Sequence, residues 1–251
     1  MAKKSFEKNS DLRAVQKACL YGAIAHSFAI LATIYCFRAG DLSQFSVERL
    51  MSFAAIHPLL WQINSLALLT ACLSLTYFLI CLYKIAPAKD APRKIFCLFL
   101  VMIALTVDVQ TFFNLMLHFV DVSYRSLYDT ALNRSILRLE GWMILDQALG
   151  RIFILSNILY ALAGYHLTEF LLEKTMVSRR IGQAGQVIWI LLFLVSILTF
   201  ASLVPQAIFL FFWTIVLFIV WLIVLYVNAD GLTQQSETSA PVDSEADNKD
   251  N

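Results

Sequence analysis

Residues 95–120 read IFCLFLVMIALTVDVQTFFNLMLHFV, an apolar run with a single acid, Asp108, well inside it. A helix of about 20 residues, rising about 1.5 Å per residue, crosses the hydrocarbon core of a bilayer, so this stretch is long enough to span a membrane. Placing a charged carboxylate there costs roughly 2.5–3.5 kcal/mol on insertion scales. We therefore expect Asp108 to face protein, water or a ligand instead of lipid.

The composition of the chain is typical of a membrane protein. Of its 251 residues, 59% are hydrophobic and only 15% are charged, and the net charge is +1. Such a small net charge creates no field that would attract nucleic acid, which excludes that class of partner. The five cysteines lie in or beside apolar runs without a C-x-x-C pair, a pattern that indicates neither a disulfide framework nor a zinc site.

The lengths of the apolar runs predict an all-α integral membrane protein with six transmembrane helices. The second span begins at Pro58, because proline suits the first turn of a helix. A basic segment, residues 1–17, precedes the first span, and residues 228–251 have the acidic composition of a disordered tail. The six expected spans are residues 18–37, 58–83, 95–120, 152–172, 187–204 and 207–227.

The connection between the third and fourth spans contains a candidate amphipathic helix, residues 126–149. Apolar residues recur in it every three or four positions, from Tyr128 to Met143, while Arg134 and Arg138 lie off that stripe. This pattern predicts a helix that lies on the membrane surface or covers the bundle. A helical loop packed on its own protein is the alternative.

The distribution of lysine and arginine predicts the orientation. Twelve of these residues lie in the N-terminal segment and the two short connections on the side of the membrane that contains both termini, and six lie in the connections on the other side. The positive-inside rule then places both termini in the cytoplasm and residues 126–149 on the outer side. A bacterial inner membrane is the simplest compartment that fits this topology.

Polar side chains are concentrated in the first four spans. Every intramembrane His, Asp, Glu, Asn and Gln lies in those four helices, whereas the last two contain only Ser and Thr as polar groups within their apolar runs. We therefore expect the first four helices to form a polar-centred bundle and the last two to form a lipid-facing hairpin.

The most specific site prediction centres on Asp108. At 100° per residue, Gln110, Asn114 and His118 share one face of span three. On span two, His57 and Asn64 share a face. If the two faces meet, they form an outward-facing ligand-binding site with Asp108 at its floor.

No intramembrane Lys or Arg is available to pair with Asp108, so the acid would be neutral or would bind a proton or a cation. The sequence thus predicts a membrane protein that binds or moves a small ligand or a proton. The plainer alternative is a protonated acid that is hydrogen-bonded to a neighbouring helix and only stabilises the bundle.

A second hypothesis uses the four histidines. His26 and His166 are expected at one depth of the membrane, and His57 and His118 at another. Two pairs of imidazoles at two depths could bind two b-type haems for transmembrane electron transfer. In layout this arrangement resembles the six-helix cytochromes of the cytochrome b561 group, although the histidine spacings match no motif of that group.

A third hypothesis is an accessory subunit whose helices pack against a protein partner in a membrane complex. Enzyme activity is not indicated, because the chain lacks H-E-x-x-H, G-x-S-x-G and paired intramembrane aspartates. No metal site is expected outside the haem hypothesis.

Overall fold

The computed structural model describes residues 2–40, 46–85, 91–173 and 177–238. Within these residues every regular element is a helix, and six helices are long and apolar enough to cross a membrane. The protein is therefore a helical, multi-pass membrane protein. These six helical stretches are Arg13–Gly40, Pro58–Ile85, Ala91–Tyr128, Asn133–Leu172, Arg179–Phe200 and Val204–Asn228.

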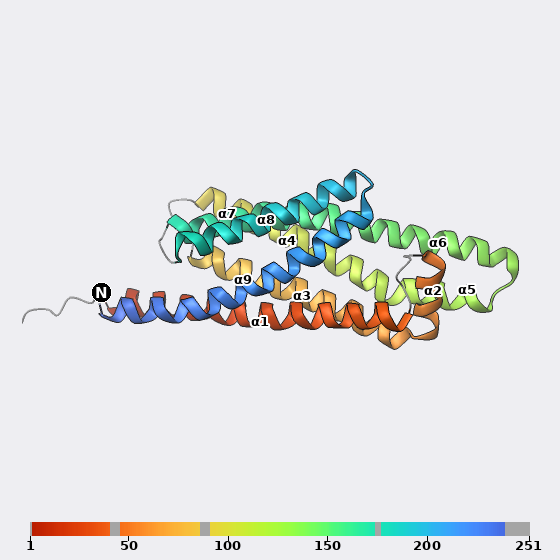
Figure 1. The fold of residues 1–251 in the computed structure, drawn as a ribbon, viewed down its shortest axis with the longest axis horizontal. Coiled ribbons are helices and arrows are strands. Elements are labelled where there is room, and N and C mark those ends of the chain that lie inside the picture. Colours follow the sequence, from red (N-terminus) through yellow and green to blue (C-terminus); the bar gives the residue numbers. More distant parts are fainter. Residues whose placement is uncertain (1, 41–45, 86–90, 174–176, 239–251) are drawn as a thin grey trace, which may run out of the picture.

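The elements follow one another in a simple up-and-down order (Figure 1). A short helix, α2, separates the first two long helices and ends at Ile56, and His57 then directly precedes the proline that starts α3. The elements are α1 (Ala2–Gly40), α2 (Val47–Ile56), α3 (Pro58–Ile85), α4 (Ala91–Phe113), η3 (Asn114–His118), α5 (Phe119–Tyr128), α6 (Ala131–Leu149), η4 (Gly150–Ser156), α7 (Asn157–Glu173), α8 (Arg179–Phe200) and α9 (Val204–Thr238).

The third and fourth long helices continue well beyond their apolar runs. Elements α4, η3 and α5 follow one another without a break, and so do α6, η4 and α7. No proline occurs between Pro92 and Pro205, so no helix-breaking proline interrupts either of these two helices. At 1.5 Å per residue the two helices are about 57 and 64 Å long, twice the thickness of the hydrocarbon core.

Most of the segment predicted as a separate amphipathic helix, residues 126–149, therefore belongs to α6 and is continuous with the fourth span. Elements α5 and α6 form an antiparallel hairpin that extends past the ends of the other long helices (Figure 1). Helix α2 packs against both of them. We call α2, α5 and α6 the cap, and we call the opposite end of the bundle, with Lys84, Arg93 and Arg179, the basic end.

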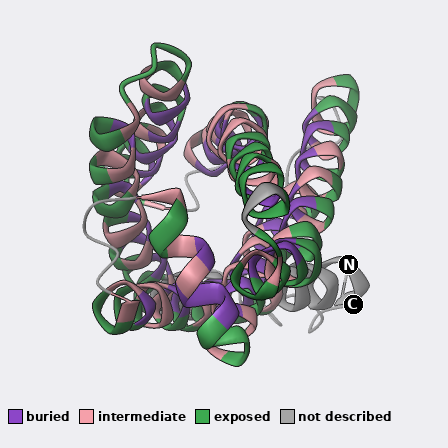
Figure 2. Ribbon diagram, turned by 90° about the vertical axis from the view of Figure 1, so that its right-hand side faces the viewer, coloured by how far each residue is buried: buried purple, intermediate pink, exposed green. Residues whose placement is uncertain are grey.

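The six long helices form a closed ring of neighbours: α1 packs against α3, α3 against α4, α4 against α7, α7 against α8, α8 against α9, and α9 against α1. Figure 2, viewed onto the end that carries the cap, shows the helices with exposed faces outward and buried faces turned toward one another.

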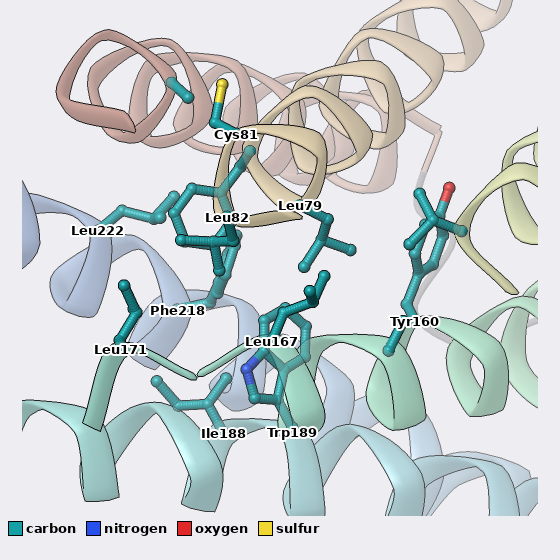
Figure 3. Close-up of a cluster of buried hydrophobic side chains, with 14 of the residues drawn as sticks. Leu79, Cys81, Leu82, Tyr160, Leu167, Leu171, Ile188, Trp189, Phe218 and Leu222 are labelled. Carbon is teal, nitrogen blue, oxygen red and sulfur yellow. The ribbon is translucent and has the colours of Figure 1, made fainter. Parts of the chain in front are cut away.

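The largest core cluster contains side chains from all six long helices. Figure 3 shows Leu82 of α3, Leu167 of α7, Trp189 of α8 and Phe218 of α9 converging on one centre. Helices α8 and α9 thus contribute buried aromatic side chains to the core. The sequence predicts a lipid-facing hairpin, but only the other face of these two helices carries exposed side chains, such as Phe209.

Two glycines let tryptophan rings approach neighbouring helices closely. A methyl group on Gly164 would lie 2.5 Å from ring carbons of Trp189, and one on Gly185 would meet the ring of Trp221. The indole nitrogen of Trp189 donates a hydrogen bond of 2.8 Å to the hydroxyl oxygen of Thr168. Small residues at helix interfaces and a satisfied indole N–H are what tight packing in a membrane requires.

Candidate functional site

Asp108 lies on the buried face of α4 and is 1% exposed. Ala104, one turn before it, and Thr111 and Phe112, one turn after it, are buried on the same face. Residues spaced by three and four positions share a side of a helix, so this run of small and apolar neighbours turns the acid toward the protein interior.

Three side chains from neighbouring elements face the carboxyl group of Asp108: Cys72 of α3, Ser156 at the end of η4, and Tyr160 of α7. The hydroxyl groups of Tyr160 and Thr76 lie 3.2 Å apart, and both side chains are buried. Tyr160 lies at the edge of the core cluster, with its hydroxyl pointing away from Trp189 (Figure 3). The acid thus sits among hydroxyl and thiol groups contributed by three elements.

Both carboxyl oxygens of Asp108 are buried and have no hydrogen-bond partner. The hydroxyl of Ser156 donates instead to the main-chain oxygen of Ala104, at 3.4 Å. An unsatisfied buried polar group costs about 1–3 kcal/mol, and a charged one costs more. Among the described residues no Lys, Arg or His forms an ion pair with Asp108. Chemically, the site can hold a proton or accept hydrogen bonds from its own hydroxyl groups.

The structure places the other residues of span three on a different face from Asp108. Gln110, Asn114 and His118 are exposed, and the imidazole of His118 lies 3.3 Å from the carboxylate of Glu140. At 100° per residue, Gln110 lies about 200° and Asn114 about 240° around the helix from Asp108, and His118 is the last residue of the π-helical segment η3. Their role in ligand binding stays a prediction.

The two predicted residues of span two also lie in separate environments. Asn64 accepts a hydrogen bond of 2.9 Å from the hydroxyl of Thr33 on α1. His57 is exposed and lines an open cleft together with Arg49 and Ser52 of α2. The structure therefore brings neither residue to Asp108, and their part in a binding site is likewise a prediction.

The four histidines have different neighbours. His26 is buried, its Nδ1 lies 2.8 Å from the main-chain oxygen of Gly22, and its ring packs edge-on against Phe218. His57 contacts the ring of Phe53. No described interaction joins His26 to His166 or His57 to His118, the pairs that the haem hypothesis requires.

A separate polar cluster lies at the basic end. The guanidinium of Arg93 on α4 pairs with the carboxylate of Glu169 on α7, and it lies 2.6 Å from Nδ1 of His166. It also packs over the ring of Phe170, 5.2 Å from its centre. This cluster ties α4 to α7. Within the described part of the chain, no group of three or more His, Cys, Asp or Glu side chains could hold a metal ion.

Sequence reasoning did not select the residues that surround Asp108. Cys72 and Thr76 are four residues apart on α3, and Ser156, at the end of η4, is four residues before Tyr160 of α7. The available signal for these neighbours is a pair of polar groups at helical spacing inside an apolar span. It is weak alone, because such residues also occur singly in many membrane helices.

Comparisons of the chain with protein-family models, with curated proteins and with solved structures find no match in any of the three.

Proposed function

We propose that this multi-pass membrane protein binds a proton at Asp108 within the membrane and couples that binding to the movement of a proton or a small ligand. The observation that carries the proposal is the pair of buried carboxyl oxygens without a hydrogen-bond partner or an ion pair. Ionisable residues are rare inside membrane helices and usually mark a functional site, and the charged form of an acid is costly there unless it is paired.

The neighbours of Asp108 suit an acid that exists in two protonation states. A carboxylate accepts hydrogen bonds, whereas a carboxylic acid also donates one. The hydroxyl groups of Ser156 and Tyr160 can do either, since a hydroxyl is both donor and acceptor. A fixed cation such as arginine would instead hold the acid in the charged state.

Proton movement can be tested in proteoliposomes that contain a pH-sensitive dye and carry an imposed membrane potential. We expect the wild-type protein to acidify the lumen and Asp108→Asn to abolish acidification. The matched control is Asp121→Asn, which alters an exposed acid that pairs with Arg125 on α5. Equal acidification by the wild type and Asp108→Asn would remove Asp108 from proton movement.

An accessory subunit is the second candidate function, and exposed apolar residues on α6 favour it. Ile136, Leu139, Trp142 and Met143 are each about half exposed or more. If residues 152–172 cross the membrane, lipid does not cover these side chains. A photo-crosslinking residue at position 142 should then capture a protein in native membranes, whereas one at Arg134 should not. A lone, uncrosslinked chain from both variants would count against a partner.

A further inference from the structure

Two π-helical segments interrupt the long helices near Asp108. Segment η3 lies in the helix that carries the acid, and η4 lies at the junction of α6 and α7 and packs against α4. A π-helical turn contains more residues than an α-helical turn, is rare, and frequently occurs at functional sites. A change from π to α geometry alters the rotation of the helix that follows, because each residue accounts for about 100°.

Ser156 connects η4 to the acid. It is the last residue of η4, it is 1% exposed, and it faces the carboxyl group of Asp108. Its hydroxyl donates to the main-chain oxygen of Ala104, one turn before Asp108 on α4. Ser156 therefore has two acceptors within reach on the same helix, and it uses only the carbonyl in this structure.

The preferred acceptor of Ser156 depends on the charge of Asp108. A hydrogen bond to a carboxylate is roughly twice as strong as one between neutral groups, so an ionised Asp108 competes well with the carbonyl of Ala104. A protonated Asp108 competes less well. The other titratable groups that face the acid are the Cys72 thiol from α3 and the Tyr160 phenol from α7, while His118 of η3 lies beside Glu140 instead.

We propose that the protonation state of Asp108 sets the helical geometry of η4 through Ser156, and with it the rotation of α6 and the cap relative to the bundle. This inference rests on the proposed function, because it requires Asp108 to exchange a proton. When the acid loses its proton, the hydroxyl of Ser156 turns from Ala104 to the carboxylate and tightens η4 toward α-helical geometry. When the acid regains its proton, η4 returns to the wider turn described above.

Hydrogen exchange of the full-length protein in nanodiscs tests this coupling. At one pH, the wild type is compared with Asp108→Asn, and Ser156→Ala with the double variant, in peptides that cover residues 147–160, so intrinsic exchange rates cancel within each pair. At pH values where Asp108 is ionised, we expect η4 to exchange roughly 2- to 12-fold more slowly in the wild type than in Asp108→Asn, the range that one hydrogen bond supports. In the Ser156→Ala background this difference should disappear.

Two further variants keep the test specific to Ser156. Ser156→Thr retains a hydroxyl, so η4 should still exchange more slowly with Asp108 than with Asn at position 108. Ser126→Ala removes a hydroxyl that donates to a main-chain oxygen in α5, and it should leave the same difference in η4 exchange unchanged. A difference that persists in Ser156→Ala, or is lost in Ser126→Ala, overturns the role of Ser156.

The infrared C=O band of the protonated Asp108 carboxyl is followed in parallel. If this band titrates while η4 exchanges identically in the wild type and Asp108→Asn at every pH, the coupling is wrong and proton binding stands. If Asp108 shows no titrating band, both the coupling and the proposed function are wrong.

Discussion

The indole nitrogen of Trp61 donates a hydrogen bond of 2.8 Å to the main-chain oxygen of Leu115, inside the π-helical segment η3. The same indole ring packs against Phe119, with ring centres 5.0 Å apart. A side chain of α3 thus satisfies a carbonyl in an irregular turn of the neighbouring helix, where regular main-chain bonding is interrupted. This contact links the bundle to the cap.

Replacing Trp61 with Phe should destabilise the protein by about 0.5–1.5 kcal/mol, the usual net contribution of one hydrogen bond. Phenylalanine retains much of the packing on Phe119, so the loss of stability measures mainly the missing hydrogen bond to Leu115. Denaturant unfolding in detergent measures the change. The control is Trp142→Phe, since Trp142 is half exposed. Equal stability of the two variants would show that the Leu115 contact contributes little.

Adding one methyl group at Gly164 should destabilise the core by about 1–3 kcal/mol, the usual cost of overpacking. The new methyl would meet the Trp189 ring and displace it from its hydrogen bond with Thr168. The comparison is Gly150→Ala, where a methyl meets nothing within 4 Å. Thermal unfolding should separate the two, and a Gly164→Ala protein as stable as the wild type would contradict the described Trp189 position.

The turn between α5 and α6 should lose stability in acid. Hydrogen bonds donated by the Asn133 side chain and the Thr130 main-chain N–H lower the pKa of the Asp129 carboxyl. Because the pKa is lower in the folded state, the charged Asp129 carboxyl contributes fully to the stability of the turn above its unfolded-state pKa, about 3.9. This contribution is lost as the pH falls through the folded-state pKa.

Hydrogen exchange at Thr130 and Asn133 measures that effect. Asp129→Ala should exchange faster than the wild type at neutral pH and equally fast once the wild-type acid is protonated. A difference that persists unchanged at low pH would show that the Asp129 charge is not responsible.

A reduced-minus-oxidised visible spectrum should lack haem bands, even after expression with an adequate haem supply. The Nδ1 atom of His26 lies at a main-chain oxygen, and His166 lies at Arg93, so these histidines already have partners other than each other. Sharp α and β bands in the reduced protein would instead favour the haem hypothesis.

Sequence alone predicts the six apolar helices, because span length depends only on local hydrophobicity. It does not predict that the helices around residues 120 and 150 continue into the cap. The length of an apolar run indicates which residues can cross the hydrocarbon core, but it does not indicate where the helix ends. Burial of Asp108 follows from the cost of its charge in lipid. Its neighbours Cys72, Ser156 and Tyr160 do not follow, because helical spacing fixes which residues share a face but not which faces meet.

The infrared titration of purified protein in nanodiscs tests the central claim most directly. A carboxyl C=O band should appear as pH falls, should be present in Asp121→Asn, and should be missing from Asp108→Asn. A wild-type protein whose titrating carboxyl bands are unchanged by Asp108→Asn would contradict proton binding at Asp108.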